Sequence, residues 1–301
     1  MDKHQHTHPH ISGKNLFYTI LLNVAITIAQ IIGGFWSGSL ALLSDAVHNF
    51  SDVLSLIVSF VANWLTHKRK QTLSQTFGFK RAEIVAAFFN AGTLIIIAIF
   101  LIIEAIKRFQ NPQDISGNIV IFLAIVGIVG NGMGVLFLQK DATHNLNMKS
   151  AYLHLFTDML TSVAVLIGGI VMKFYQIYWV DPVLTLFISV YLIYMSWKVF
   201  IDSLKILMLF APDQIVMKNI EKVIEEVSGV KNIHHVHIWQ LNDHDIHFEA
   251  HIEFENDIQL SDFDQRCQEI ELLLQDKFGI NHTNIQPEFK RDDSKDFIIQ
   301  D

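Results

Sequence analysis

The chain has 301 residues, of which 51% are hydrophobic, and its mean hydropathy of +0.33 is high for a soluble protein. Charge is divided unevenly, because residues 211–301 hold 20 of the 30 acidic residues and only 8 of the 22 basic ones; this acidic part disfavours nucleic acid and anionic lipid as partners and suits a cation. The single cysteine, Cys267, excludes an intrachain disulfide and a cysteine-rich zinc module.

The chain begins with a histidine-rich segment, residues 1–15, which we expect to be a cytoplasmic tail. Its run of His4, His6, His8 and His10 can collect metal loosely, or it can be a polar tail without a role. The first apolar run begins near Leu16 and is too long for the apolar core of a secretory signal.

Six apolar segments follow, and each is long enough to cross a bilayer as a helix, because a crossing takes roughly 20 helical residues. Such helices would contact membrane lipid. They lie at residues 16–36, 40–65, 82–106, 117–138, 149–172 and 179–203. We therefore predict an α-helical membrane bundle of six transmembrane helices, which makes residues 16–208 a membrane domain.

The basic residues predict the orientation of these helices. Nine lysine and arginine residues lie on the side of the bundle where the chain enters it, and only three lie in the turns on the other side. Because basic residues collect on the cytoplasmic side, both termini are expected in the cytoplasm. The size of the chain and the lack of a targeting segment favour a multi-pass protein of the bacterial inner membrane.

After residue 208 the pattern changes to that of a soluble domain, which we place at residues 209–301. In chain order it predicts a helix at 213–228, strands at 232–241 and 245–255, a helix at 260–278 and a strand at 281–289. This αββαβ order predicts a cytoplasmic α+β domain of the ferredoxin-like kind. The last residues, 291–301, are expected to form a frayed polar tail.

Ionisable residues are rare within the predicted spans, and each is a candidate for function because placing one in a membrane costs about 2.5–3.5 kcal/mol. The second span contains His48 and Asp52, and the fifth contains His154 and Asp158. Each pair is spaced four residues apart, so that one imidazole and one carboxylate share a helix face. The two pairs have similar depths in antiparallel spans, and we predict that the four side chains meet near the bilayer centre.

This donor set indicates the kind of metal that it would bind. Two imidazole nitrogens and two carboxylate oxygens suit four-coordinate Zn²⁺, whereas Ca²⁺ and Mg²⁺ prefer sites made mostly of oxygen. The alternative is that both pairs are structural and only hold helices together. Asp45, one turn before His48, is a candidate for the outward path of the ion, and Asn49 is a candidate for shaping the site.

Three stretches of the sequence resemble the cation diffusion facilitator family: residues 43–52 (LSDAVHNFSD), 77–83 (FGFKRAE) and 145–158 (NLNMKSAYLHLFTD). With the six spans and the αββαβ domain, the resemblance extends over nearly the whole chain. It implies a homodimeric Zn²⁺/H⁺ antiporter whose transport site uses the His48/Asp52 and His154/Asp158 pairs. Histidine rather than aspartate at position 48 implies a preference for Zn²⁺ over Cd²⁺, with Cd²⁺ and Co²⁺ as further candidate substrates.

The resemblance also implies that zinc binds the cytoplasmic domain as a regulatory ligand. By position, the family's ligands correspond to His234, His251 and Glu288, while Asp264 and Gln286 stand where some members have histidine. Seven histidines in residues 211–301 support a metal-sensing and dimerisation domain. The alternative is that alternation along the strands merely places these histidines on a solvated face.

Together these features predict a secondary active transporter that exports divalent transition metal, Zn²⁺ above all, from the cytoplasm in exchange for protons. Histidine titrates near neutrality and metal binds only deprotonated ligands, so the two ions compete for one site. The sequence has no GxxxxGK[ST] nucleotide motif, which leaves the proton gradient as the energy source. Alternatives are a membrane-bound metal sensor and an intramembrane metal-dependent hydrolase, but the sequence lacks HExxH and we expect no enzyme.

Overall fold

The computed structural model describes residues 13–68, 72–139 and 146–298, so the run from His4 to His10 lies outside the described residues. The chain divides into two compact units. One consists of Met1–Phe60 and Phe89–Val199, and the other of Val61–Phe88 and Phe200–Asp301.

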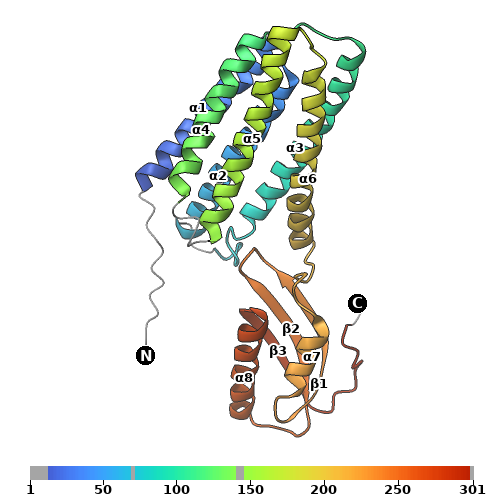
Figure 1. The fold of residues 1–301 in the computed structure, drawn as a ribbon. Coiled ribbons are helices and arrows are strands. Elements are labelled where there is room, and N and C mark those ends of the chain that lie inside the picture. The colour runs from blue at the N-terminus through green and yellow to red at the C-terminus, as the bar shows by residue number, and fades with distance from the viewer. Residues whose placement is uncertain (1–12, 69–71, 140–145, 299–301) are drawn as a thin grey trace. The chain divides into compact units, whose positions relative to one another are not determined.

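Six long helices among the described residues lie at the positions where the sequence predicts spans (Figure 1). They are α1 (Gly13–Ser37), α2 (Leu40–Lys68), α3 (Ala82–Gln110), α4 (Gly117–Leu138), α5 (Leu146–Tyr175) and α6 (Val180–Leu207). Within the described residues, four of them, α3 to α6, are long and apolar enough to cross a membrane, whereas the apolar part of α1, Asn23–Ser37, is shorter. The chain thus contains a helical bundle with several membrane-spanning helices.

A buried carboxylate fixes where α2 begins. Asp181, at the start of α6, accepts hydrogen bonds from the Ser39 hydroxyl and from the backbone amides of Leu40 and Ala41. Amides in the first turn of a helix have no partner within that helix, and a negative charge also complements the positive end of its dipole. Asp181 therefore ties the start of α2 to the start of α6.

Close packing of α4 against α5 and α1 depends on a glycine. A Cβ added at Gly127 would lie 2.8 Å from the Ser162 hydroxyl oxygen on α5 and 3.0 Å from the Gln30 side-chain nitrogen on α1. The missing side chain lets these three helices approach one another. Buried apolar side chains complete the packing, among them Leu42, Ala98, Val120, Met172 and Leu192.

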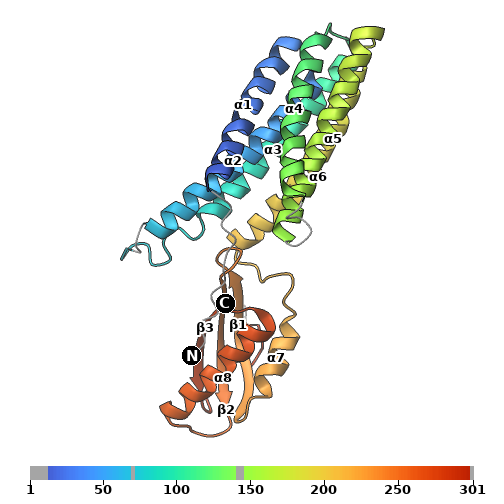
Figure 2. The ribbon, with the colours of Figure 1, turned by 60° about the vertical axis from the view of Figure 1, so that its left-hand side comes forward.

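The second unit contains a three-stranded sheet with two helices on one face (Figure 2). Its elements are α7 (Met217–Glu225), β1 (Val230–Gln240), β2 (Ile246–Phe254), α8 (Leu260–Phe278) and β3 (His282–Glu288), in the predicted order. β1 and β2 pair antiparallel, whereas β2 and β3 pair parallel, and β2 is the central strand. Alternation along β2 buries Phe248, Ala250 and Ile252 in the core with α7 and α8 and turns the residues between them to the opposite face.

A bulge interrupts the pairing of β1, which is an edge strand of the sheet. His234 lies opposite His251, but His237 lies opposite Glu249, so β1 has one residue more than β2 between these two pairs. His235 adopts a left-handed backbone conformation at this point, with a φ of 51°. Such bulges redirect side chains and leave backbone groups unpaired in the ladder.

The chain after β3 returns to this bulge. The backbone amides of His235 and Val236 donate hydrogen bonds to the carbonyl oxygens of Asp296 and Phe297, at 3.2 and 2.9 Å. The Phe297 side chain packs against the apolar core of the domain. The prediction of a frayed tail is therefore wrong for residues 291–298, which the edge of the sheet holds in place.

Candidate metal centres

The first candidate centre lies between α2 and α5. On α2, Asp52 Oδ2 lies 3.7 Å from His48 Nε2. On α5, Asp158 Oδ2 lies 3.6 Å from His154 Nε2. Each helix therefore presents one imidazole and one carboxylate on a single face, as residues four apart on a helix do.

Contacts between the two helices join these pairs into a ring. His48 Nε2 lies 3.1 Å from Asp158 Oδ1, and His154 Nε2 lies 3.3 Å from Asp52 Oδ2. Each imidazole thus faces both carboxylates. The structure brings together all four side chains that the sequence predicted, and we call this group the membrane ring.

The imidazole–carboxylate separations within the membrane ring are close to those of a zinc site. Zinc binds nitrogen and carboxylate oxygen at about 2.0–2.2 Å, so neighbouring donors of a tetrahedral site lie about 3.3–3.6 Å apart. The four imidazole–carboxylate separations here range from 3.1 to 3.7 Å. The tightest donor group among the described residues holds His48, His154 and Asp158, while Asp52 contacts both imidazoles from outside it. The side chains of His48 and Asp158 are 10% and 5% exposed, whereas those of Asp52 and His154 are 34% and 42% exposed. The ring is therefore buried on one side and accessible on the other.

A hydrogen-bonded network lies beside the ring. Asp45 is buried, and its Oδ2 accepts hydrogen bonds from Gln30 at 3.0 Å and from Ser162 at 3.3 Å. Gln30 in turn accepts a hydrogen bond from Asn49 at 2.9 Å. This network joins α1, α2 and α5 one turn from His48. Asp45 is not part of the close donor group among the described residues, which consists of His48, His154 and Asp158.

A tyrosine that no sequence pattern singled out also borders the ring. Tyr191 on α6 lies edge to face with His48, with ring centroids 6.4 Å apart. In the sequence, Tyr191 is one of several tyrosines in apolar segments, and nothing near it sets it apart from a tyrosine that only packs in the core or at the membrane interface. Only the packing of α6 brings it to the ring.

The second candidate centre lies on the sheet face opposite α7 and α8. His234 on β1, His251 on β2 and Glu288 on β3 converge there, as the resemblance implied. His234 Nε2 lies 3.1 Å from Glu288 Oε2, and His251 Nδ1 lies 2.9 Å from Glu288 Oε1. Asp293 completes the group, with Oδ2 3.9 Å from His234 Nε2. We call these four residues the cytoplasmic cluster.

Two positions that correspond to histidines of some family members do not join the cluster as donors. Asp264 is exposed on α8, on the other face of the sheet. Gln286 lies on β3 and donates a hydrogen bond to Glu288 Oε1 at 3.0 Å, which orients that carboxylate. The fourth donor is instead Asp293, which sequence reasoning missed because it reaches the cluster only through the return of the chain after β3.

Hydrogen bonds fix the ring of His234. The side-chain nitrogen of Asn232 donates to Glu253 at 3.0 Å, so the Asn232 oxygen faces His234 Nδ1, also at 3.0 Å. Nδ1 therefore carries a proton, and in the neutral ring Nε2 presents its lone pair to Glu288. Two acceptors at this separation repel each other unless a cation lies beside them.

The charges of the cluster favour the protonation states that bind metal. Burial would raise the pKa of Glu288, but hydrogen bonding to Lys295 outweighs it and holds that pKa below its usual range. The hydrogen bond from Lys295 likewise lowers the pKa of Asp293. Burial lowers the pKa of His251, with help from His235 and against the charge of Glu288. Ionised carboxylates and neutral imidazoles are the forms that coordinate a metal.

His251 adds a further sign of an incomplete donor set. Its Nδ1 is buried and, although close to Glu288, makes no hydrogen bond of acceptable geometry among the described residues. A buried polar atom without a hydrogen-bond partner usually has a functional explanation. Coordination of a metal by this nitrogen would supply one.

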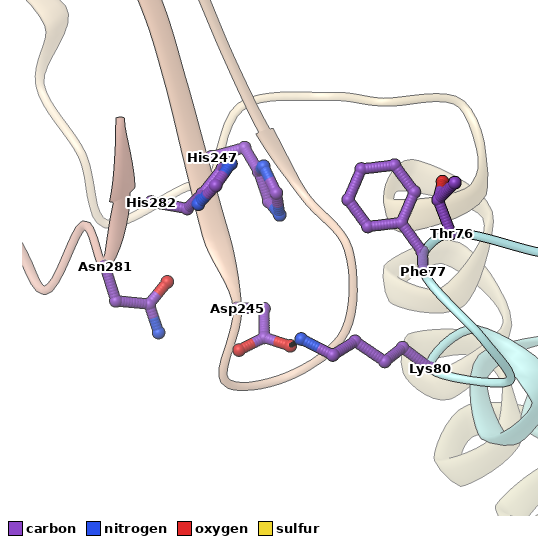
Figure 3. Close-up of a pocket in the computed structure, with 7 residues that line it drawn as sticks. All are labelled: Thr76, Phe77, Lys80, Asp245, His247, Asn281 and His282. Carbon is purple, nitrogen blue, oxygen red and sulfur yellow. Dashed lines mark ion pairs between the residues drawn. The ribbon is translucent and has the colours of Figure 1, made fainter. Parts of the chain in front are cut away.

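A pocket of about 310 Å³ in the second unit contains two further histidines (Figure 3). His247 and His282 lie side by side there, with ring centroids 4.3 Å apart. The carboxylate in the pocket, Asp245, is already paired with Lys80 Nζ at 2.7 Å. These residues do not form one of the close donor groups found among the described residues. We therefore assign no metal to this pocket.

The apolar helical bundle brings two imidazoles beside two carboxylates, and the small α+β domain that follows holds a second such group. These features define the class as a membrane protein that handles divalent metal. The comparisons with known families specify it further. A family described as the cation efflux transmembrane domain matches residues 16–208, and one described as the cation efflux protein cytoplasmic domain matches residues 212–290. The chain belongs to the cation efflux family, also called the cation diffusion facilitator family, as its sequence motifs indicated.

Relatives from several bacteria match nearly the whole chain. A cadmium, cobalt and zinc/H⁺-K⁺ antiporter of Bacillus subtilis is 36% identical over 93% of this chain and 91% of its own length. The metal cation efflux system protein CzcD of Cupriavidus metallidurans is 33% identical over 94% of this chain and 89% of its own length. The zinc transporter ZitB of Escherichia coli is 30% identical over 95% of this chain and 92% of its own length. The family is one of transporters rather than enzymes, as the sequence predicted.

Proposed function

We propose that this protein is a secondary active transporter that exports divalent transition metal, Zn²⁺ above all, from the cytoplasm in exchange for protons. The observation that carries the proposal is the membrane ring, His48, Asp52, His154 and Asp158, in which each imidazole lies 3.1–3.7 Å from both carboxylates. Its imidazole nitrogens separate it from the oxygen-rich sites that Ca²⁺ and Mg²⁺ prefer. The name of the Bacillus subtilis relative adds Cd²⁺ and Co²⁺ as further candidate substrates.

The charge of the ring supports exchange with protons. With Zn²⁺ bound, the two carboxylates balance the charge of the ion. Without metal, two protonated imidazoles balance the same carboxylates. Because net charge inside a membrane is costly, a ring that trades one zinc ion for two protons stays near neutral in both states. Protons and metal compete for the same nitrogens, which couples their movements.

The arrangement of the chain in the membrane is part of the proposal. All six long helices cross the membrane within a transport domain at residues 16–208, and residues 209–301 form a ferredoxin-like cytoplasmic domain through which two copies assemble as a homodimer. Both termini, including the histidine-rich segment 1–15, face the cytoplasm. The bacterial relatives support placement in the bacterial inner membrane.

The cytoplasmic cluster is proposed to bind Zn²⁺ as a regulatory ligand. Its donors come from three strands and from the segment after β3, so a bound ion would cross-link the whole sheet. The Nδ1 of His251, which is buried and has no hydrogen-bond partner among the described residues, supports this proposal.

Zinc uptake by sealed liposomes that contain the purified protein tests the transport proposal. An imposed pH gradient should drive zinc uptake, and Asp52→Ala should abolish it. Asp202→Asn, a change at an exposed carboxylate of α6, should leave uptake intact. Undiminished uptake by the Asp52→Ala protein would contradict the ring site. Zinc binding without uptake by the wild-type protein would favour the alternative of a membrane-bound sensor.

A further inference from the structure

The segment after β3 places a lysine within the cytoplasmic cluster. Lys295 Nζ lies 3.0 Å from Glu288 Oε2, 2.5 Å from Asp293 Oδ1 and 3.3 Å from His234 Nε2. The side chains of Glu288 and His234 are almost fully buried, at 1% and 0% exposed, and that of Lys295 is 28% exposed. The ammonium group therefore contacts three of the four donor residues and remains connected to solvent.

The ammonium group satisfies the acceptors that a metal would otherwise satisfy. It has three N–H donors and no acceptor. Three acceptors surround it: the lone pair of His234 Nε2 and one oxygen from each of Glu288 and Asp293. A zinc ion bound to the same atoms would lie about 2.0–2.2 Å from each of them. That position overlaps the ammonium group, so Lys295 and a metal ion cannot occupy the cluster together.

The fold holds Lys295 in place through its neighbours along the chain. The next two residues, Asp296 and Phe297, accept hydrogen bonds from the bulge of β1, and Phe297 packs into the core. On the other side, Arg291 pairs with Glu288 at 3.3 Å and with Asp293 at 3.6 Å. Anchors on both sides give the ammonium group a high local concentration at the cluster.

We propose that Lys295 is a built-in competitor for metal at the cytoplasmic cluster. A divalent ion binds His234, His251, Glu288 and Asp293 only by displacing the Lys295 ammonium group into solvent. The cluster therefore responds to cytoplasmic metal above a threshold that Lys295 sets, and it exposes a free lysine when it is filled. This inference rests on the proposed binding of zinc by the cluster.

Two measurements on the full-length protein in detergent test the proposal. The background carries Asp52→Asn and Asp158→Asn, which silence the membrane ring. In the first, equilibrium dialysis measures how much zinc is bound at each free zinc concentration. The zinc bound by the cluster is the amount bound without Glu288→Gln minus the amount bound with it, and its dependence on free zinc gives the affinity of the cluster. Lys295→Gln should bind zinc at least about tenfold more tightly, equivalent to about 1.4 kcal/mol. Lys277→Gln, the same change at an exposed lysine of α8, should bind like the parent.

In the second measurement, acetic anhydride labels lysines of the protein with native Lys295, and mass spectrometry reads each site. Zinc should increase labelling of Lys295 several-fold and leave that of Lys277 unchanged. This reading does not depend on how the Lys295→Gln protein folds.

The outcomes separate the two proposals. If Glu288→Gln removes no bound zinc, the cluster is not a metal site and the proposed regulatory role fails. If Glu288→Gln removes zinc but Lys295→Gln leaves the affinity unchanged, or zinc leaves Lys295 labelling unchanged, the cluster binds metal and Lys295 is not its competitor.

Discussion

Replacing Asp158 with asparagine should remove the negative charge that faces both imidazoles of the membrane ring while keeping the shape of the side chain. Its oxygens lie 3.1 Å from His48 Nε2 and 3.6 Å from His154 Nε2, and its side chain is 5% exposed. Two unit charges 4 Å apart interact by about 4 kcal/mol at an effective dielectric constant of 20. A divalent ion in the ring would lie closer than about 4 Å to the carboxylate and carry twice the charge, which makes the loss larger. The asparagine avoids the cost of desolvating a carboxylate, which makes the loss smaller. We therefore expect a loss of about 4 kcal/mol, which is roughly a thousandfold in zinc affinity.

The assay is competition between the protein and a zinc-chelating dye in detergent, with Glu288→Gln present in every variant to silence the cytoplasmic cluster. Asp202→Asn serves as the matched control, since it makes the same change at an exposed position of α6. Its affinity should equal that of the parent. An Asp158→Asn protein that is folded and monodisperse, yet binds zinc within a few-fold of the parent, would refute the assignment of Asp158 as a donor.

Three further predictions concern packing, stoichiometry and pH. Gly127→Ala should destabilise the bundle by about 1–3 kcal/mol, seen as a lower Tm, because its methyl group would lie 2.8 Å from the Ser162 hydroxyl; Gly132→Ala, whose methyl group meets nothing closer than 3.6 Å, should leave the Tm unchanged. Glu288→Gln should lower the zinc content by one ion per chain in metal analysis, and an unchanged zinc content would contradict zinc binding by the cytoplasmic cluster. Because burial lowers the pKa of His251 from 6.5, its imidazole is neutral at pH 7, so zinc binding by the cluster should weaken only as the pH falls below 6.5 and protons compete for this nitrogen; a steep change between pH 7 and 8 would contradict this.

The helices and the membrane ring were predictable because they depend on local periodicity. Long apolar runs predict helices whatever surrounds them, and the four-residue spacing of His48 and Asp52 directs both side chains to one face. Gly279, which ends α8 in a left-handed conformation, was also recognisable from the sequence. The helix predicted at 213–228 was too long at both ends, because α7 covers only Met217–Glu225.

Residues whose roles depend on distant contacts were not predictable. Asp181 caps α2 from a helix more than a hundred residues away, and nothing near it in the sequence indicates that role. Asp293 and Lys295 looked like part of a polar tail, because a charged segment without periodicity gives no sign that it returns to a sheet. Only the bulge at His235, with its unpaired backbone amides, explains where that segment binds.

The central claim is that zinc and protons exchange at the membrane ring, and simultaneous recording of zinc entry and internal pH in sealed proteoliposomes tests it most directly. When zinc is added outside, it should enter through molecules whose cytoplasmic side faces outward, and protons should leave, so the internal pH rises in proportion to zinc uptake. An acidic interior should accelerate zinc entry, and Asp52→Asn combined with Asp158→Asn should abolish both signals. Zinc entry that changes no internal pH and ignores an imposed pH gradient would contradict the exchange mechanism.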